Sequence, residues 1–245
     1  MAVAHGSRDP RSAATVSALL DVLRERRPGL DVRAAFLDLS APRLSDVLAG
    51  LYAEDRHEVV VAPLLLGRAY HAGVDIPGAL DQATSRHPLL RVRVADVLGP
   101  DPRLEATALR RLAAAGADPA DPELGVVLAG AGSSHQPANA AVHRVARGWL
   151  RRTRWAGAGA AFAAAATPDV PAAIAALRAR GARRIALGSW FLAPGLLPDR
   201  VIAAARAADP DVLIAEPLGA AGEVAEVVFS RYATADLGEL ALPVA

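Results

Sequence analysis

The chain repeats its own plan at a constant spacing of 126 residues, and this feature constrains its fold most strongly. The segment VAHGSRDP from Val3 parallels AGAGSSHQ from Ala129, and 129 minus 3 is 126. Phe36 parallels Phe162, and Val59 parallels Ile185, at the same spacing. Three matches at one spacing indicate an internal duplication. We therefore expect two domains of one fold, residues 1–115 and 124–245, joined by the turn-rich segment GADPADPE.

Each copy alternates short apolar runs with longer amphipathic stretches. In the first copy the helical spacing is clearest over residues 12–27, where Val16, Leu19, Leu20 and Leu23 share one face. Strands that alternate with helices are typical of parallel sheets. The predicted fold class is α/β, with two tandem doubly wound parallel-sheet domains related by duplication. In the first copy we predict strands at 2–4, 32–37, 58–63 and 92–97 and further helices at 43–52, 78–85 and 102–114.

Composition excludes several kinds of chemistry and partner. The chain contains no Cys, which excludes disulfides, thiolate metal sites and Fe–S clusters, so a metal would need His, carboxylate or water ligands. All 27 basic residues are Arg, which excludes Lys-based chemistry. A net charge of +1 predicts no nucleic-acid partner. We find no long apolar run and no signal-peptide pattern, so we expect no membrane association and a cytoplasmic location.

Three potential metal ligands follow the predicted strands of the first copy. His5 follows the first strand, Asp38 the second, and His71 lies in the loop after the third; successive ligands are 33 residues apart, since 38 minus 5 and 71 minus 38 are both 33. The carboxyl ends of parallel strands lie at one edge of a sheet, where ligands bind. Two imidazoles and a carboxylate suit Fe²⁺, Co²⁺, Ni²⁺ or Zn²⁺. This pattern predicts a metal site at that edge.

The second copy lacks all three groups. At the spacing of 126, His5 corresponds to Ala131, Asp38 to Ala164 and His71 to Leu197. A role in folding is expected to recur in both copies, whereas a chemical role needs only one site. The contrast favours a metal-handling role for the first copy. Two alternatives remain at this point: a non-catalytic metal carrier or sensor that uses the same His pair, and an unrelated α/β enzyme with His5 as a general base.

The motifs AHGSRDPR, FLDL and PLLLGRAYHAGVDIP resemble those of the sirohydrochlorin chelatases of the CbiX/SirB kind, the class II chelatases. The resemblance covers nearly the whole chain as two fused copies. It implies chelatase-like domains that face each other across a cleft. It also implies a lyase that inserts Fe²⁺ or Co²⁺ into sirohydrochlorin, for sirohaem or cobalamin biosynthesis. The metal is then a substrate, no cofactor is bound permanently, and we expect a monomer with one active centre, in the first copy.

The resemblance also implies roles for individual residues. His5 and His71 would be the metal-binding and catalytic histidines. The family usually has Glu where this chain has Asp38, whose shorter side chain would reach the metal either directly or through water. Sirohydrochlorin carries many carboxylates, with which Arg forms bidentate pairs. Arg8 and Arg68, beside the two site loops, and the hydroxyl of Ser7 are therefore expected to bind this substrate.

Overall fold

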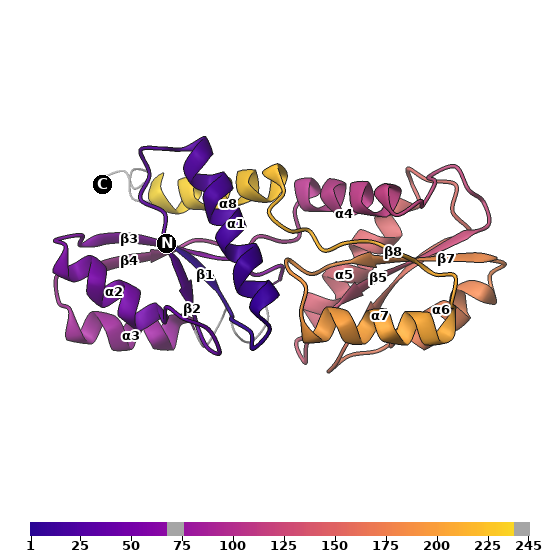
Figure 1. Cartoon of the computed structure of the whole chain (residues 1–245), viewed down its shortest axis with the longest axis horizontal. Helices are drawn as coiled ribbons and strands as arrows, with labels where there is room; N and C mark the ends of the chain where they lie inside the picture. Colours follow the sequence, from indigo (N-terminus) through magenta and orange to yellow (C-terminus); the bar gives the residue numbers. More distant parts are fainter. Residues whose placement is uncertain (68–75, 238–245) are drawn as a thin grey trace, which may run out of the picture. The chain divides into compact units, whose positions relative to one another are not determined.

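The computed structural model describes residues 1–67 and 76–237 (Figure 1). Strands and helices alternate along the chain, as predicted from the sequence. The elements of the first copy are β1 (Ala2–Ala4), α1 (Pro10–Arg26), β2 (Ala34–Phe36), α2 (Leu44–Ala53), β3 (Glu58–Pro63), α3 (Ile76–Arg86), β4 (Arg91–Val94) and α4 (Pro102–Ala114). Those of the second are β5 (Leu124–Gly130), α5 (Gln136–Trp149), β6 (Gly157–Phe162), α6 (Val170–Arg178), β7 (Arg184–Ser189), α7 (Leu196–Ala208), β8 (Leu213–Ile214) and α8 (Gly222–Leu237).

The strands form two parallel sheets of four strands with the same order. The first sheet runs β2-β1-β3-β4 and the second β6-β5-β7-β8. The opening strand of each copy therefore lies between its second and third strands, which places the loops after these strands at one edge. These sheets confirm the predicted fold class of two duplicated α/β domains.

Helices cover both faces of each sheet. In the first sheet's unit, α2 packs against α3 and α1 packs against α8; in the second, α6 packs against α7, and α4 and α5 contact strands. The core under α2 and α3 is built from buried aliphatic side chains, among them Val3, Leu48, Val61 and Ile76. None of the described helices is long and apolar enough to cross a membrane.

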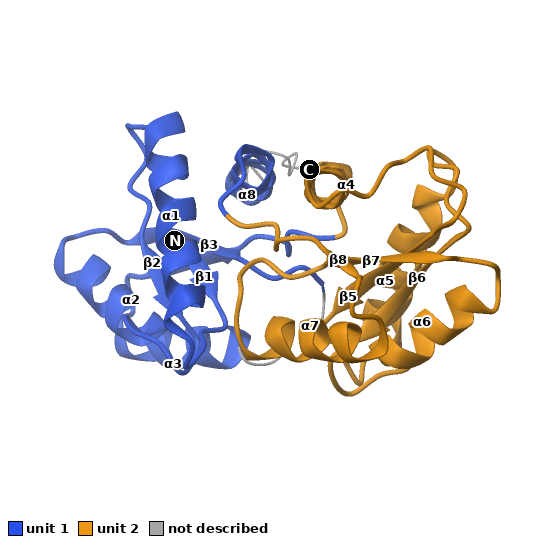
Figure 2. Cartoon of the chain, turned by 45° about the vertical axis from the view of Figure 1, so that its right-hand side comes forward, with its two compact units in different colours: residues 1–99, 220–245 blue, residues 100–219 orange. Residues whose placement is uncertain are grey.

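The last helix of each sequence copy belongs to the other copy's compact unit. One unit comprises Met1–Gly99 and Ala220–Ala245, and the other Pro100–Gly219 (Figure 2). Helix α4 follows the first sheet in sequence but contacts β7, and Leu112 lies so close to Gly188 that an added Cβ there would stand 3.2 Å from its Cδ1. Helix α8 contacts β3 and β4, and Arg231 donates hydrogen bonds to the carbonyls of Val97 and Leu98 at 2.9 and 3.0 Å.

These units differ from the predicted domains, 1–115 and 124–245, because the terminal helices are exchanged. An amphipathic helix needs an apolar sheet face to cover, but its sequence pattern does not specify which sheet provides that face. Leu104, Ala108 and Leu112 form the buried stripe of α4. The repeat boundary in the sequence and the boundary of the compact units are therefore separate properties of this chain.

Candidate metal site

The loops after β1 and β2 meet at the carboxyl edge of the first sheet, as the strand order predicts. The amide of Leu37 donates a hydrogen bond to the carbonyl of Ala4 at 3.0 Å. At the next residue of both strands, the amide of Asp38 donates to the carbonyl of His5 at 2.9 Å. His5 is half-buried and Asp38 is exposed. The structure therefore brings together two of the three predicted ligands by backbone pairing between adjacent strand ends.

Gly6 makes this close approach possible. Its φ is +94°, a conformation that residues with a Cβ rarely adopt. A Cβ at this position would lie 1.7 Å from the carbonyl oxygen of Asp38, which is a backbone atom and cannot swing aside. The glycine after His5 is thus required for the contact between the two loops.

Asp38 also carries an ion pair that was not predicted. Its Oδ1 accepts a hydrogen bond from a guanidinium nitrogen of Arg43 at 2.7 Å, and both side chains are about half exposed. The pKa of Asp38 is lowered first by the hydrogen bond from the Leu39 amide and then by that from Arg43; the charge that His5 bears when protonated lowers it further. The carboxylate is therefore held in its charged form beside His5.

Ser7 and Ser40 fasten the two loops together. The Ser40 hydroxyl accepts from the Ser7 amide at 3.1 Å and donates to the Ser7 carbonyl at 2.9 Å. The Ser7 hydroxyl accepts from the Asp9 amide at 3.0 Å, and Asp9 caps α1. Ser7 thus takes part in the loop structure through its amide, its carbonyl and its hydroxyl oxygen. Arg8 is exposed beside it.

His71 and Arg68, the other predicted site residues, lie outside the described residues. Within residues 1–67 and 76–237, no group of three His, Cys, Asp or Glu side chains could hold a metal ion. The described part of the site is therefore the pair His5 and Asp38, and the roles of the six predicted site residues stay predictions.

The second unit keeps the backbone of this site without its chemical groups. The amide of Ala164 donates to the carbonyl of Ala131 at 3.0 Å, which reproduces the bond between Asp38 and His5. Gly132 has φ +84°, and a Cβ there would lie 1.9 Å from the carbonyl oxygen of Ala164. The duplicated loops thus share one conformation, and methyl groups replace the imidazole and the carboxylate. Folding of these loops does not require the polar side chains.

The sequence did not lead us to predict a role for Arg43 in the site, although the two copies differ at this position. Arg43 corresponds to Asp169, since 169 minus 43 is 126. Asp169 caps α6 by accepting a hydrogen bond from the Ala172 amide at 2.9 Å, a common role for Asp. Arg43 occupies the matching cap position of α2 without a side-chain cap bond and contacts Asp38 instead. It departs from the repeat in the same way as His5 and Asp38.

Comparison with models of protein families shows which family this chain belongs to. The family model named CbiX matches residues 1–115 and 125–235, which are both sequence copies. The chain belongs to the CbiX family. Its curated relatives include a sirohydrochlorin cobaltochelatase and a sirohydrochlorin ferrochelatase, both of Priestia megaterium. The first is 24% identical over 201 residues, or 81% of this chain, and the second 23% identical over 202 residues, also 81%.

The match spans 65% of the cobaltochelatase and 74% of the ferrochelatase. A third relative, a sirohydrochlorin cobaltochelatase of Methanosarcina acetivorans, is 31% identical over 80 residues, or 33% of this chain and 62% of the relative.

Solved structures show the same fold. SirB from Bacillus subtilis with Fe³⁺ superposes with a TM-score of 0.81 at 23% identity, over 98% of this chain and 96% of that one. A structure of CbiX, described as the terminal enzyme for biosynthesis of siroheme in denitrifying bacteria, superposes with a TM-score of 0.63 at 23% identity, over 99% and 98%. At this low sequence identity, the superpositions show only that the fold is shared. The reaction of this chain has to be inferred from its site.

Proposed function

We propose that this chain is a sirohydrochlorin chelatase that inserts Fe²⁺ or Co²⁺ into sirohydrochlorin, in sirohaem or cobalamin biosynthesis. One observation carries the proposal: the first unit adds an imidazole and a carboxylate to a loop frame that the second unit builds with alanines. Membership of the CbiX family, whose relatives carry the names of sirohydrochlorin chelatases, supports the choice of substrate.

In this proposal His5 and His71 bind the incoming metal through neutral imidazole nitrogens. Asp38 balances part of the metal's charge, directly or through a water molecule. The tetrapyrrole must lose two pyrrole protons as the metal enters, so one histidine holds the metal while the other accepts a proton. Water ligands on an open side of the metal are displaced by pyrrole nitrogens.

The charged groups at the loop ends suit an acidic tetrapyrrole. Arg8 is exposed two residues after Gly6, and Arg68 lies outside the described residues. Guanidinium groups recognise carboxylates through two parallel hydrogen bonds. We expect Arg8 and Arg68 to bind substrate carboxylates and the Ser7 hydroxyl to donate a hydrogen bond.

A chelation assay tests this function directly. Sirohydrochlorin is mixed with Co²⁺ or Fe²⁺ and catalytic amounts of protein, and absorbance reports the metallated product. Insertion well above the rate without protein supports the chelatase. If the chain binds Co²⁺ tightly but leaves the insertion rate unchanged, the carrier or sensor alternative replaces it.

The pH dependence of metal affinity should identify the ligands. Hydrogen bonds from Leu39 and Arg43 keep the pKa of Asp38 below its usual range, so this carboxylate stays ionised between pH 5 and 8. Ordinary histidines titrate near pH ~6.5, and each bound proton competes with the metal. Co²⁺ affinity should therefore be full near pH ~8 and fall at lower pH, with a limiting slope of about two for two histidines. Co²⁺ titrations across this range measure the slope, and a flat affinity would remove His5 and His71 as principal ligands.

Replacing Arg43 should strengthen metal binding if Asp38 is a direct ligand. The Arg43 guanidinium donates a hydrogen bond to Oδ1 of Asp38, and its positive charge lies beside the site. Exposed ion pairs contribute about 0–1 kcal/mol, so Arg43→Ala should raise Co²⁺ affinity by up to about fivefold. Arg183→Ala, which removes an exposed ion pair with Glu123 in the other unit, is the control and should leave the affinity unchanged. Equal affinities for both variants would indicate that Asp38 does not contact the metal directly.

A further inference from the structure

The guanidinium of Arg43, beside the candidate metal site, has an edge that the described residues leave unbound. Its Nη1 donates to Oδ1 of Asp38 at 2.7 Å and to the Leu37 carbonyl at 3.3 Å. Within residues 1–67 and 76–237, no group accepts a hydrogen bond from its Nε or Nη2. These two nitrogens form one edge of the guanidinium, which presents two parallel N–H donors. This edge can bind an anion.

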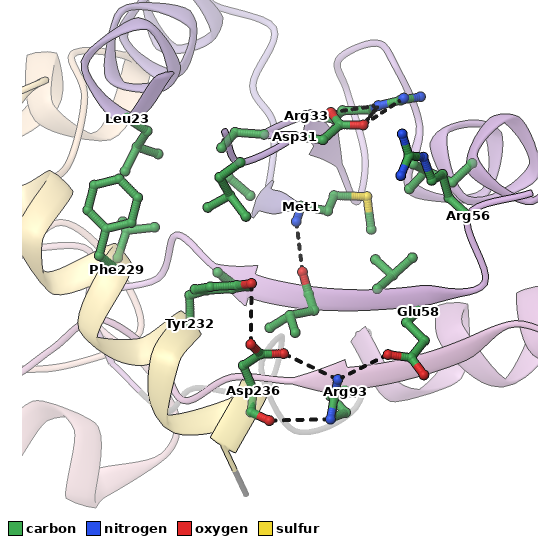
Figure 3. A pocket seen from close by; sticks show the side chains of 18 residues that line it. Met1, Leu23, Asp31, Arg33, Arg56, Glu58, Arg93, Phe229, Tyr232 and Asp236 are labelled. Atoms are coloured by element: carbon green, nitrogen blue, oxygen red, sulfur yellow. Dashed lines mark hydrogen bonds and ion pairs between the residues drawn. The ribbon is translucent and has the colours of Figure 1, made fainter. Parts of the chain in front are cut away.

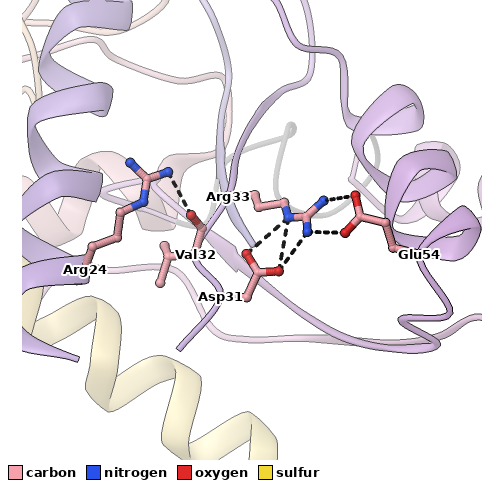
Figure 4. A network of polar contacts seen from close by, with 5 residues as sticks. All are labelled: Arg24, Asp31, Val32, Arg33 and Glu54. Carbon is pink, nitrogen blue, oxygen red and sulfur yellow. Dashed lines mark hydrogen bonds and ion pairs between the residues drawn. The ribbon is translucent and has the colours of Figure 1, made fainter. Parts of the chain in front are cut away.

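Arg33 shows how the same edge binds a carboxylate in this unit (Figure 4). Its Nε and Nη2 donate to the two carboxylate oxygens of Asp31 at 3.1 and 2.8 Å. Its Nη1 donates to Glu54 at 2.9 Å on the other side. All three guanidinium nitrogens therefore have carboxylate partners, and these hydrogen bonds lower the pKa of both carboxyl groups. The equivalent edge of Arg43 would accept a carboxylate through the same two parallel hydrogen bonds.

Arg93, on β4, is also bound at more than one nitrogen (Figure 3). Its Nη2 lies 3.2 Å from Oδ1 of Asp236 and 3.7 Å from Oε2 of Glu58. Its Nη1 donates to the Asp236 carbonyl at 3.4 Å. Of the three arginines compared here, the one that is bound through a single nitrogen is therefore the one that contacts a proposed metal ligand.

Arg43 is an unfavourable residue for its position in the fold. It stands at the N-terminal cap of α2 and makes no side-chain cap bond. Helix N-termini carry a partial positive charge, which disfavours a cation there. The corresponding residue of the second unit, Asp169, accepts a hydrogen bond from the Ala172 amide, as cap residues usually do. Asp or Ser would stabilise α2 better than Arg, which indicates that Arg43 serves the site and not the helix.

We propose that Arg43 binds a carboxylate of sirohydrochlorin through Nε and Nη2 while its Nη1 stays on Asp38. The inference rests on the proposed function, in which the substrate is a tetrapyrrole with many carboxylates. A guanidinium and a carboxylate that meet edge to edge make two parallel, charge-assisted hydrogen bonds. One guanidinium then links the substrate to the loop of Asp38, so Arg43 fixes the position of the tetrapyrrole relative to the proposed metal ligands.

Two variants of Arg43 and one control test this role in the full chain. Arg43→Ser removes the guanidinium and supplies a hydroxyl of the type that caps helices, so α2 should remain stable. Arg43→Lys keeps the positive charge but has no edge with two parallel donors. Arg24→Ala is the matched control, because the Arg24 side chain is 51% exposed, like that of Arg43, and pairs with Asp21 at 3.1 Å. Arg24 belongs to α1 and also donates to the Val32 carbonyl at 3.0 Å (Figure 4).

Equilibrium dialysis of sirohydrochlorin without metal measures Kd, initial rates with Co²⁺ measure KM and kcat, and thermal unfolding checks the fold. We expect Arg43→Ser to raise Kd and KM about tenfold, the low end for hydrogen bonds between charged groups, because water partly screens the half-exposed guanidinium. The kcat should stay within about threefold, since the lost contact is made before and during insertion alike. Arg43→Lys should raise Kd about threefold, and Arg24→Ala should leave it within about twofold.

The same measurements separate this role from the alternatives. An unchanged Kd in Arg43→Ser, while the unmodified chain binds and metallates sirohydrochlorin, would overturn the inference and leave the proposed function intact. A loss of kcat or of Co²⁺ affinity with an unchanged Kd would mean that Arg43 only positions Asp38, and full affinity in Arg43→Lys would mean that charge alone is needed; either result overturns the proposed contact. An unmodified chain that neither binds nor metallates sirohydrochlorin removes the proposed function itself, and the role of Arg43 with it.

Discussion

Replacing His5 by Ala is expected to lower the rate of metal insertion into sirohydrochlorin by more than about a hundredfold, because loss of outer partners of metal ligands alone typically costs 10–100-fold. Co²⁺ affinity should fall in parallel, since the variant lacks one of two proposed imidazole ligands. The fold should be unaffected, because Ala131 occupies the equivalent position of the second unit with the same backbone hydrogen bond. Absorbance assays of insertion and Co²⁺ titrations measure the two effects, and circular dichroism checks the fold.

His135→Ala and His143→Ala are the matched controls in the second unit. His135 stands at the cap position of α5 without a side-chain cap bond. The His143 ring packs edge-on against Phe162 at 5.4 Å, and burial lowers its pKa. Neither residue corresponds to a proposed ligand, so both variants should retain the insertion rate within about twofold. Losses as large as that of His5→Ala would show that the active unit has been assigned wrongly.

Gly6→Ala is expected to abolish metal binding by forcing apart the loops that carry His5 and Asp38. The new Cβ would lie 1.7 Å from the Asp38 carbonyl oxygen at a φ of +94°. The strained backbone and the contact together should destabilise the first unit by at least about 2 kcal/mol, in the upper range for single substitutions. Calorimetry measures the destabilisation, and Co²⁺ titration below the unfolding transition measures the affinity.

Gly132→Ala repeats the same change in the second unit. Its Cβ would lie 1.9 Å from the Ala164 carbonyl oxygen at a φ of +84°, so a destabilisation of similar size is expected there. The second unit lacks the imidazole and the carboxylate, so Co²⁺ affinity should remain within about twofold of that of the unmodified chain. Retained Co²⁺ binding in Gly6→Ala would contradict the assignment of the metal site to these loops.

Much of the fold could be predicted because hydrophobic periodicity reports local structure directly. The predicted strands at 2–4 and 58–63 and the helix at 102–114 have the bounds that the structure shows. The strand predicted at 32–37 is shorter, Ala34–Phe36, and its three residues are those that pair with Ala2–Ala4 of β1. The exchange of α4 and α8 could not be predicted, because two similar sheets offer equivalent apolar faces.

The candidate site was predicted as far as strand topology determines it. Ligands bind at the carboxyl edge of a parallel sheet, and this rule predicts that the loops of His5 and Asp38 are adjacent. The hydrogen bond of 2.9 Å from the Asp38 amide to the His5 carbonyl shows that these two backbones are adjacent. The Asp38–Arg43 pair depends on how the intervening loop turns, including Leu39 at φ +60°, and sequence spacing alone does not give such contacts. His71 and Arg68 lie outside the described residues, so the part of His71 in the site rests on its place after the third strand and on the family resemblance, and that of Arg68 on the resemblance.

The exchange of the terminal helices also sets an order in which the protein can be completed during synthesis. The unit formed by Pro100–Gly219 is one continuous stretch, so all of its parts exist once residue 219 has left the ribosome. The unit with His5 is begun first but lacks α8 until residues 222–237 have been made, and the Arg26–Glu226 and Arg231 contacts form only then. Nascent domains usually fold in the order of synthesis. In this chain the unit whose first strand is translated first is therefore the unit that is completed last, because it waits for α8.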